Sequence, residues 1–171
     1  TDDDYNTDVN NTTPVVTLLN ENFGTVTGSN QVPAGWTVTN SGTATNKFVG
    51  NNAGASTYGF TGNTLHISNG NATAVGNGTA AMAYTVTTTT DARVTTPTLN
   101  ATGMRNLALS FDFVSNGEQD ITGIYDFGVI YYSTDGGTTY NIVRDGGNNI
   151  ITFIGINTLT PFLVALPPSV N

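Results

Sequence analysis

The fold of this chain is decided by the stretch Asn106-Leu107-Ala108-Leu109-Ser110-Phe111-Asp112-Phe113-Val114, where apolar and polar side chains alternate. A repeat of two residues is the period of a β-strand with one buried face, because successive side chains point to opposite sides of the backbone. Leu109, Phe111 and Phe113 therefore share the buried face. Asp112 points the other way, where a carboxylate must be either solvated or paired. The stretch predicts a long, half-buried strand.

A reversal of the chain is predicted downstream of this strand. Phe127, Val129 and Tyr131 repeat the alternation, and the sequence Asp135-Gly136-Gly137 follows them. Asp and Gly tolerate a positive φ, so these residues can close a hairpin into a further strand that begins near Tyr140. The stretch from 106 to 143 is therefore interpreted as a three-stranded β-meander.

The composition restricts the partners that this chain can have. Of its 171 residues only 9% are charged, four are Lys or Arg, and the net charge is −8. So few cations cannot neutralise a phosphate backbone, and we expect no nucleic-acid binding. No apolar run approaches the ~20 residues of a membrane-spanning helix, so no membrane insertion is expected. A chain without cysteine has no disulfide framework and no thiolate metal site.

Two regions are predicted along the chain. Residues 1–14 hold four Asp residues and almost nothing to bury, which predicts a flexible acidic leader. Residues 15–171 form the predicted domain, in which short apolar runs are separated by turns rich in Gly and Asn. These runs are Val15–Phe23, Lys47–Val49, Tyr58–Phe60, Leu65–Ile67, Ala80–Thr90, Arg93–Leu99, Ile150–Ile156 and Phe162–Leu166. Many short strands without a long amphipathic helix predict an all-β fold, a two-sheet antiparallel β-sandwich that is either a jelly roll or immunoglobulin-like.

Two single residues have two interpretations each. Trp36 is the only tryptophan and follows a Pro-x-Gly turn, so it is either a core anchor or a platform on which a sugar stacks. His66 is the only histidine. It is flanked by Leu65 and Ile67, which face the other way in a strand, and we expect it to point to solvent. An incidental histidine and a catalytic base or ligand are its alternatives.

The chain carries few groups suited to catalysis. A Ser-His-Asp mechanism needs a nucleophile on a strained turn, and no Gly-x-Ser-x-Gly sequence accompanies the single histidine. A glycosidase needs two carboxyl groups across one cleft. The candidates are Glu21, Asp112, Glu118, Asp120 and Asp126, and the sequence does not show that any two of them face each other. We therefore expect a protein without enzymatic activity.

Five short motifs follow one another along the domain. They are Leu18–Phe23, Pro33–Thr37, Val94–Leu99, Leu107–Phe113 and Tyr131–Tyr140. In this order they resemble the cleaved-adhesin and choice-of-anchor J type domains, which are jelly-roll sandwiches of secreted Bacteroidota surface proteins and similar in outline to MAM domains. The resemblance covers residues 15–171. It implies a non-catalytic extracellular module for adhesion or carbohydrate contact, exported by the type IX secretion route.

The resemblance also implies a structural calcium ion. It places Glu21 in a first-strand Glu-x-Phe position that supplies a calcium ligand, with Asp112 and Asp126 as further candidates. Calcium suits such residues because it takes oxygen ligands from carboxylates and backbone carbonyls. From the residues alone, Asp112 is equally well explained as a solvent-facing carboxylate.

One departure from the family concerns the end of the chain. The family domain continues past the sequence at 166–171 into further strands, so the sandwich is expected to lack its last strand or strands. That leaves an open edge beside Ile150–Ile156, which strand addition from a neighbouring subunit would complete. The departure therefore predicts a subunit of a surface fibre or filament.

The sequence leads to one leading function and two alternatives. The leading interpretation is a secreted or surface-displayed module for adhesion or assembly, with other subunits or an extracellular surface as its partner. The first alternative is a carbohydrate-binding module that uses exposed Tyr58, Tyr125 or Tyr132 as stacking platforms. The second is a secreted glycosidase or protease.

Overall fold

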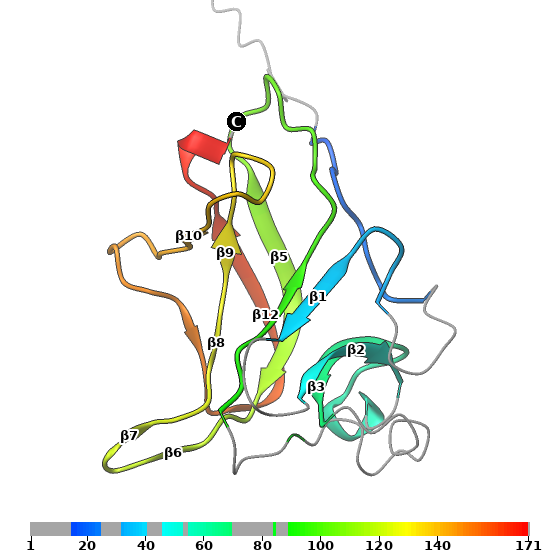
Figure 1. Cartoon of the computed structure of the whole chain (residues 1–171), viewed down its shortest axis with the longest axis vertical. Helices are drawn as coiled ribbons and strands as arrows, with labels where there is room; N and C mark the ends of the chain where they lie inside the picture. The colour runs from blue at the N-terminus through cyan, green and yellow to red at the C-terminus, as the bar shows by residue number, and fades with distance from the viewer. Residues whose placement is uncertain are drawn as a thin grey trace, which may run out of the picture.

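The computed structural model describes residues 15–24, 32–40, 46–52, 55–69, 84 and 89–170, and there the chain is all-β (Figure 1). The predicted leader, residues 1–14, lies outside the described residues, as does most of the predicted strand Ala80–Thr90. The strands are β1 (Thr37–Asn40), β2 (Lys47–Asn51), β3 (Thr64–Ser68), β4 (Ala92–Thr95), β5 (Ala108–Ser115), β6 (Gln119–Asp120), β7 (Gly123–Ile124), β8 (Gly128–Val129), β9 (Tyr131–Tyr132), β10 (Asn141–Ile142), β11 (Thr152–Phe153) and β12 (Ile156–Ala165). Two 3₁₀ turns, η1 (Ala55–Tyr58) and η2 (Pro168–Val170), complete the described elements.

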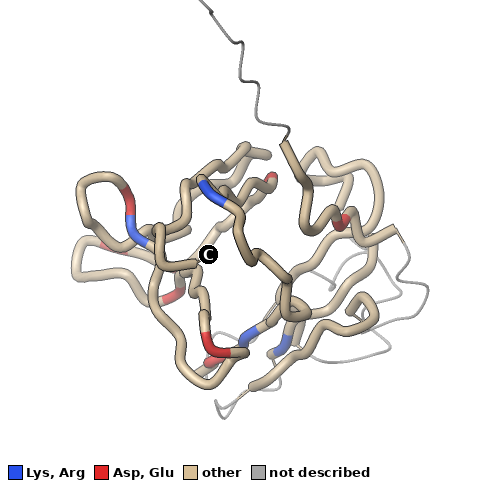
Figure 2. Tube along the Cα trace, turned by 90° about the horizontal axis from the view of Figure 1, so that it is seen from above, with Lys and Arg blue, Asp and Glu red and all other residues tan. Residues whose placement is uncertain are grey.

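The strands pair two by two, and every pair is antiparallel. The pairs are β1 with β4, β2 with β3, β5 with β12, β6 with β7, β8 with β11, and β9 with β10. The predicted fold class, all-β, is thus confirmed. Charged side chains are sparse along the described part of the chain (Figure 2).

The long strand that the alternation predicts is β5, and its less exposed face is the predicted one. Leu109, Phe111 and Phe113 are half-buried, whereas Ser110 and Asp112 are exposed. The predicted meander is wrong, because β5 pairs with β12 and not with the strand that follows it. The run from 127 to 132 is divided between β8 and β9, which pair with different strands. Among the described strands, β12 alone is as long as β5, and the two pair continuously from Thr160 opposite Phe113 to Ala165 opposite Ala108, with a register shift between Ile156 and Thr160.

Four phenylalanine rings meet on the inner face of the β5–β12 pair. Phe111 and Phe113 of β5 and Phe162 of β12 surround Phe153, which β11 supplies. The centroid of the Phe153 ring lies 4.8 Å from that of Phe113, 5.0 Å from Phe162 and 5.7 Å from Phe111. Tilted and edge-on contacts at such distances stabilise a core by about 0.5–1.5 kcal/mol each, beyond the apolar area they bury. The cluster holds β11 against the β5–β12 pair.

The strand β12 begins at the last residue of the predicted strand Ile150–Ile156 and continues through most of the predicted run Phe162–Leu166. The predicted strand Ile150–Ile156 is wrong as one element, because Gly155 has a φ of 68° and separates β11 from β12. The backbone N–H of Leu166 donates to the carbonyl of Leu107 (2.8 Å), which makes that rung a hydrogen-bonded pair. Rungs alternate in an antiparallel ladder, so Pro161 stands at a rung without hydrogen bonds. Its missing N–H therefore removes no bond to β5.

The predicted hairpin is confirmed. The strands β9 and β10 pair antiparallel, and Gly136 and Gly137 adopt φ values of 69° and 88° in the turn between them. The predicted buried face before this turn is wrong, because Phe127 is 57% exposed and Tyr131 is 46% exposed. Because β8 pairs with β11 whereas β9 pairs with β10, the run from 127 to 132 is not one strand, and its alternation of side chains does not define one buried face.

The predicted strand Val15–Phe23 is also wrong. Residues 15–24 have no regular secondary structure, and Val15 is 96% exposed. The segment is fixed instead at its end, where the ring of Phe23 packs edge-on against Trp36 at 5.8 Å. Trp36 is half-buried and follows the predicted turn, in which its N–H donates to the carbonyl of Pro33 (3.0 Å).

The orientation expected for His66 is wrong. The predicted strands at Lys47–Val49 and Leu65–Ile67 are confirmed as β2 and β3, but His66 is only 9% exposed. It shares a buried face with Thr64 and Ser68. A polar side chain can be buried there because it has hydrogen-bonding neighbours: the Thr64 hydroxyl oxygen lies 3.1 Å from Nδ1 of His66.

Candidate functional site

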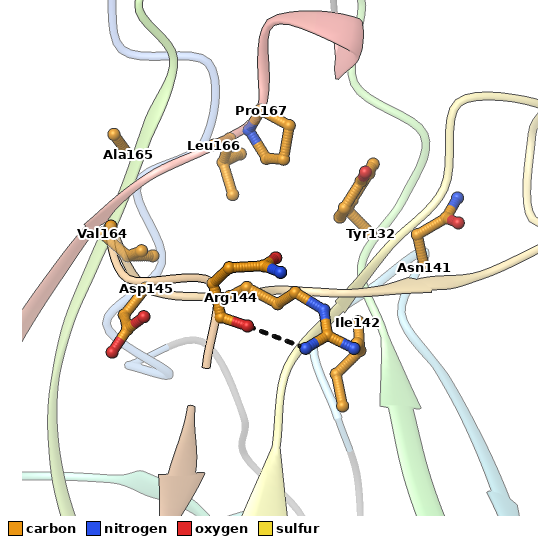
Figure 3. Close-up of a pocket in the computed structure, with 11 residues that line it drawn as sticks. Tyr132, Asn141, Ile142, Arg144, Asp145, Val164, Ala165, Leu166 and Pro167 are labelled. Atoms are coloured by element: carbon orange, nitrogen blue, oxygen red, sulfur yellow. Dashed lines mark hydrogen bonds between the residues drawn. The ribbon is translucent and has the colours of Figure 1, made fainter. Parts of the chain in front are cut away.

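An open cleft of about 600 Å³ lies where β9 and β10 approach the end of β12 (Figure 3). One wall comes from β9, β10 and the turn that follows β10. The other wall comes from the end of β12 and the residues after it. The lining residues are Tyr132, Asn141, Ile142, Arg144, Asp145, Gly146, Asn148, Val164, Ala165, Leu166 and Pro167.

The hairpin register brings Tyr132 and Asn141 to this cleft. The two residues are directly opposite each other in the β9–β10 pair, so their side chains leave the hairpin on the same side. Figure 3 shows both side chains pointing the same way. Tyr132 is half-buried and Asn141 is exposed. The pair therefore offers a phenol ring and a carboxamide at the mouth of the cleft.

A tight turn after β10 supplies the charged groups of the cleft. Arg144 pairs with Ile150 in an isolated bridge, and Arg144 Nη1 donates to the carbonyl of Asn148 (2.9 Å). The Asp145 carboxylate accepts the backbone N–H of Asn149 (2.8 Å) and that of Gly147 (2.9 Å). These hydrogen bonds, those of Asn149 first, lower the pKa of Asp145 below its usual value. The turn thus holds one guanidinium and one ionised carboxylate in fixed positions.

The opposite wall is apolar. Val164 is buried, and Ala165, Leu166 and Pro167 continue the wall beyond the last ladder rung. The hydrogen bond from Leu166 N–H to the Leu107 carbonyl fixes this wall to β5. A wall of hydrogen-bonding side chains across from an apolar wall suits a ligand with one polar and one apolar side.

Of the predicted tyrosine platforms, only Tyr132 lines this cleft. Tyr58 ends η1 and is half-buried. Tyr125 is 53% exposed beside the β6–β7 turn, where its hydroxyl contacts Thr122 and Asp120. The structure therefore does not bring the three tyrosines together.

The predicted calcium ligands are also separate. Glu21 accepts the backbone N–H of Phe23, and Asp112 is exposed opposite Pro161. Asp126 accepts the Tyr84 hydroxyl (3.0 Å); burial, and then this hydrogen bond, raise the pKa of Tyr84 to about 12. Within the described parts of the chain, no three His, Cys, Asp or Glu side chains are grouped so that they could share a metal ion. The calcium site stays a prediction.

Sequence reasoning missed most of the cleft residues. Neither Asn141 nor the residues from Arg144 to Asn149 are singled out from the sequence alone. One signal was available, because Arg144 is one of only four cationic side chains in the chain. The apolar wall had no such signal, since its role depends on the pairing of β12 with β5.

Comparison with known proteins adds no relative. Over the described residues, no helix is long and apolar enough to cross a membrane. The chain has no significant match among protein-family models, curated proteins or solved structures, so the resemblance to cleaved-adhesin type domains stays a prediction.

Proposed function

We propose that this chain is a non-catalytic extracellular β-sandwich module for cell-surface adhesion or assembly. The observation that carries the proposal is the open cleft with its polar and apolar walls. On this view the strand pairs belong to the two sheets of a jelly roll. The packing of Phe153 of β11 against Phe111, Phe113 and Phe162 supports two layers.

The chemistry of the cleft favours binding over catalysis. Asp145 is the one carboxylate among the lining residues, and its own turn occupies both oxygens: Oδ1 accepts the backbone N–H groups of Gly147 and Asn149, and Oδ2 accepts the Asn149 side-chain amide. A general acid needs a pKa raised towards neutrality, whereas the pKa of Asp145 is lowered. The glycosidase alternative needs two carboxyl groups in one cleft. Asn141, Arg144 and Tyr132 are instead groups that bind a surface by hydrogen bonds and ring contact.

The adhesion proposal is tested with the labelled chain on intact bacterial cells and on wells coated with mucin or polysaccharide. Arg144→Gln removes the guanidinium of the cleft, and Arg105→Gln removes an exposed guanidinium outside it. We expect binding to weaken about tenfold for Arg144→Gln, as for an arginine at the centre of an interface. Arg105→Gln should bind like the unaltered chain. Equal binding by all three proteins, or equal losses in both variants, would remove the cleft from the proposal.

A fibre subunit is a specific version of this proposal, and the β5 edge supports it. Ala108, Ser110 and Asp112 of β5 stand at rungs of the β5–β12 ladder without hydrogen bonds, so their backbone N–H and C=O groups point away from β12. The strand β5 pairs with no other described strand, and these groups make no backbone hydrogen bond to another described residue. On the other side of the pair, Pro161 leaves the outer edge of β12 without one backbone N–H, which disfavours the addition of a strand there. A strand added from a neighbouring subunit would therefore join β5.

Two matched proline variants test the fibre version. Ser110 and Leu163 are opposite each other at a rung without hydrogen bonds, so a proline at either position removes only an outward N–H. We expect the unaltered chain to form polymers in size-exclusion chromatography and negative-stain images. Ser110→Pro should abolish them and Leu163→Pro should leave them. A monodisperse monomer before any substitution would contradict this version.

Carbohydrate binding at the cleft is the second candidate, favoured by the position of Tyr132. A glycan array is the direct assay. We expect Tyr132→Ala to lose the signal and Tyr125→Ala, which alters an exposed tyrosine outside the cleft, to keep it. Equal retention by both variants would exclude Tyr132 as the platform.

A further inference from the structure

The β9–β10 hairpin has a second face, opposite the cleft. Tyr131 and Tyr132 are neighbours in a strand, so their side chains leave on opposite sides. Tyr140 directly precedes Asn141, the first residue of β10, and does not line the cleft. Tyr131 and Tyr140 are 46% and 43% exposed. The hairpin therefore carries two accessible aromatic rings that do not line the cleft.

Arg93 of β4 joins this face. Its guanidinium carbon lies 6.0 Å from the centre of the Tyr131 ring, within the range of a cation–π contact. Arg93 Nε and Nη2 each donate to Asp91 at 3.0 Å, one to each carboxylate oxygen. The pKa of Arg93 is raised, first by Asp91 and to a smaller degree by Tyr131 and Tyr140. Both tyrosines are thus within electrostatic range of the guanidinium.

The turn of the hairpin positions Tyr140. A Cβ placed on Gly137 would lie 3.0 Å from the Tyr140 hydroxyl oxygen, closer than side-chain atoms usually approach. The phenol therefore packs over the turn at a residue that has no side chain. This contact limits the ring to a position beside the hairpin and reduces the entropy lost on binding.

We propose that Tyr131, Tyr140 and Arg93 form a binding platform for a neutral carbohydrate. The two phenol rings present apolar surface on which the C–H face of a pyranose ring stacks. The Arg93–Asp91 pair presents donors and acceptors in one plane, which suits neighbouring sugar hydroxyls. The proposal goes beyond adhesion through the cleft, since none of its three residues lines the cleft.

Charge selects a neutral ligand over an acidic one. Asp91 compensates the positive charge of Arg93 through both carboxylate oxygens. The chain as a whole has a net charge of −8, which repels a polyanion at low ionic strength. An uncharged glycan needs no unpaired positive charge for binding, and the negative net charge of the chain does not repel it.

Affinity gel electrophoresis tests the platform with named probes. The full chain is run through gels that contain a soluble mannan, a mixed-linkage β-glucan or a galactan, and through gels with alginate as the acidic comparison. We expect at least one neutral polysaccharide to retard the chain and alginate to leave its mobility unchanged. Tyr131→Ala and Tyr140→Ala should each weaken binding roughly two- to tenfold, the value of one aromatic contact.

Matched variants separate this platform from the cleft. Tyr131→Phe keeps the ring and should retain binding, and Tyr125→Ala removes an exposed tyrosine elsewhere and should do the same. Thermal unfolding of each variant confirms that it is folded. Retardation that survives Tyr131→Ala and Tyr140→Ala but is lost in Tyr132→Ala would overturn the platform while supporting the cleft. No retardation in any neutral polysaccharide would overturn the platform and leave the adhesion assay to decide the proposed function.

Discussion

Replacement of Phe153 by alanine should destabilise the domain more than any change at an exposed ring. The Phe153 ring touches Phe113, Phe162 and Phe111 at centroid distances of 4.8, 5.0 and 5.7 Å. Truncation of a core phenylalanine costs about 3–5 kcal/mol, and because Phe153 is half-buried we expect about 3 kcal/mol. For a domain of this size that corresponds to a fall in Tm of about 6–12 °C.

Urea unfolding measures this loss, with far-UV circular dichroism and the fluorescence of the single Trp36 as two independent probes. Phe127→Ala is the matched control, since that ring is 57% exposed and should cost less than about 1 kcal/mol. Phe153→Leu keeps most of the side-chain volume but loses the three ring contacts, so it should cost less than Phe153→Ala and more than Phe127→Ala. If Phe153→Ala loses no more stability than Phe127→Ala, the rings do not hold β11 against the β5–β12 pair and the two-layer arrangement fails.

Three further predictions concern the turns and the metal. Gly137→Ala should lower the free energy of unfolding by about 1 kcal/mol, because Gly137 has a φ of 88° and its Cβ would meet Tyr140; Gly146→Ala, with nothing near its Cβ, should cost less in the same urea assay. Hydrogen bonds from Thr139, then Ser133 and Thr138, lower the pKa of Asp135 to about 2, so its contribution to stability is complete above about pH 4 and is lost as the pH falls through 2. Asp135→Asn should therefore flatten the acid limb of the Tm profile between pH 4 and 2, and an unchanged limb would contradict this assignment. If a calcium ion is structural, a chelator should lower Tm by several degrees and added calcium should restore it, whereas Glu21→Gln should abolish the response; a Tm indifferent to chelator would exclude the ion.

The parts of the fold that depend on local sequence could be predicted. The alternation around Phe111 gives β5 its face, and Asp135-Gly136-Gly137 closes the hairpin, because strand period and positive φ are properties of neighbouring residues. The partner of β5 could not be predicted, because six strands, β6 to β11, lie between β5 and β12 in the sequence and the choice of β12 depends on its length and on Phe162. The orientation of His66 could not be predicted either, because the register places His66 opposite Val49, and which face of the β2–β3 pair is buried depends on what packs against it.

The residues of the candidate site could not be predicted either, because they are brought together by strand pairing. Tyr132 was singled out as an exposed aromatic residue, but the sequence does not distinguish it from Tyr125 or Tyr58. What separates them is the register of the hairpin, which turns Tyr132 to the cleft and Tyr131 to the opposite face. A difference of one residue in that register would exchange the two surfaces.

The three proposed contact surfaces use different atoms, and this makes them separable. The cleft depends on side chains such as Arg144, and the platform depends on Tyr131 and Tyr140. Strand addition depends on the main chain of β5, which side-chain variants at those positions leave intact, while Ser110→Pro alters that edge and neither face of the β9–β10 hairpin. We expect Tyr131→Ala to lose glycan retardation but still polymerise, and Ser110→Pro to stop polymerising but still bind the glycan. Together, these two results would show that assembly and recognition depend on different parts of the fold.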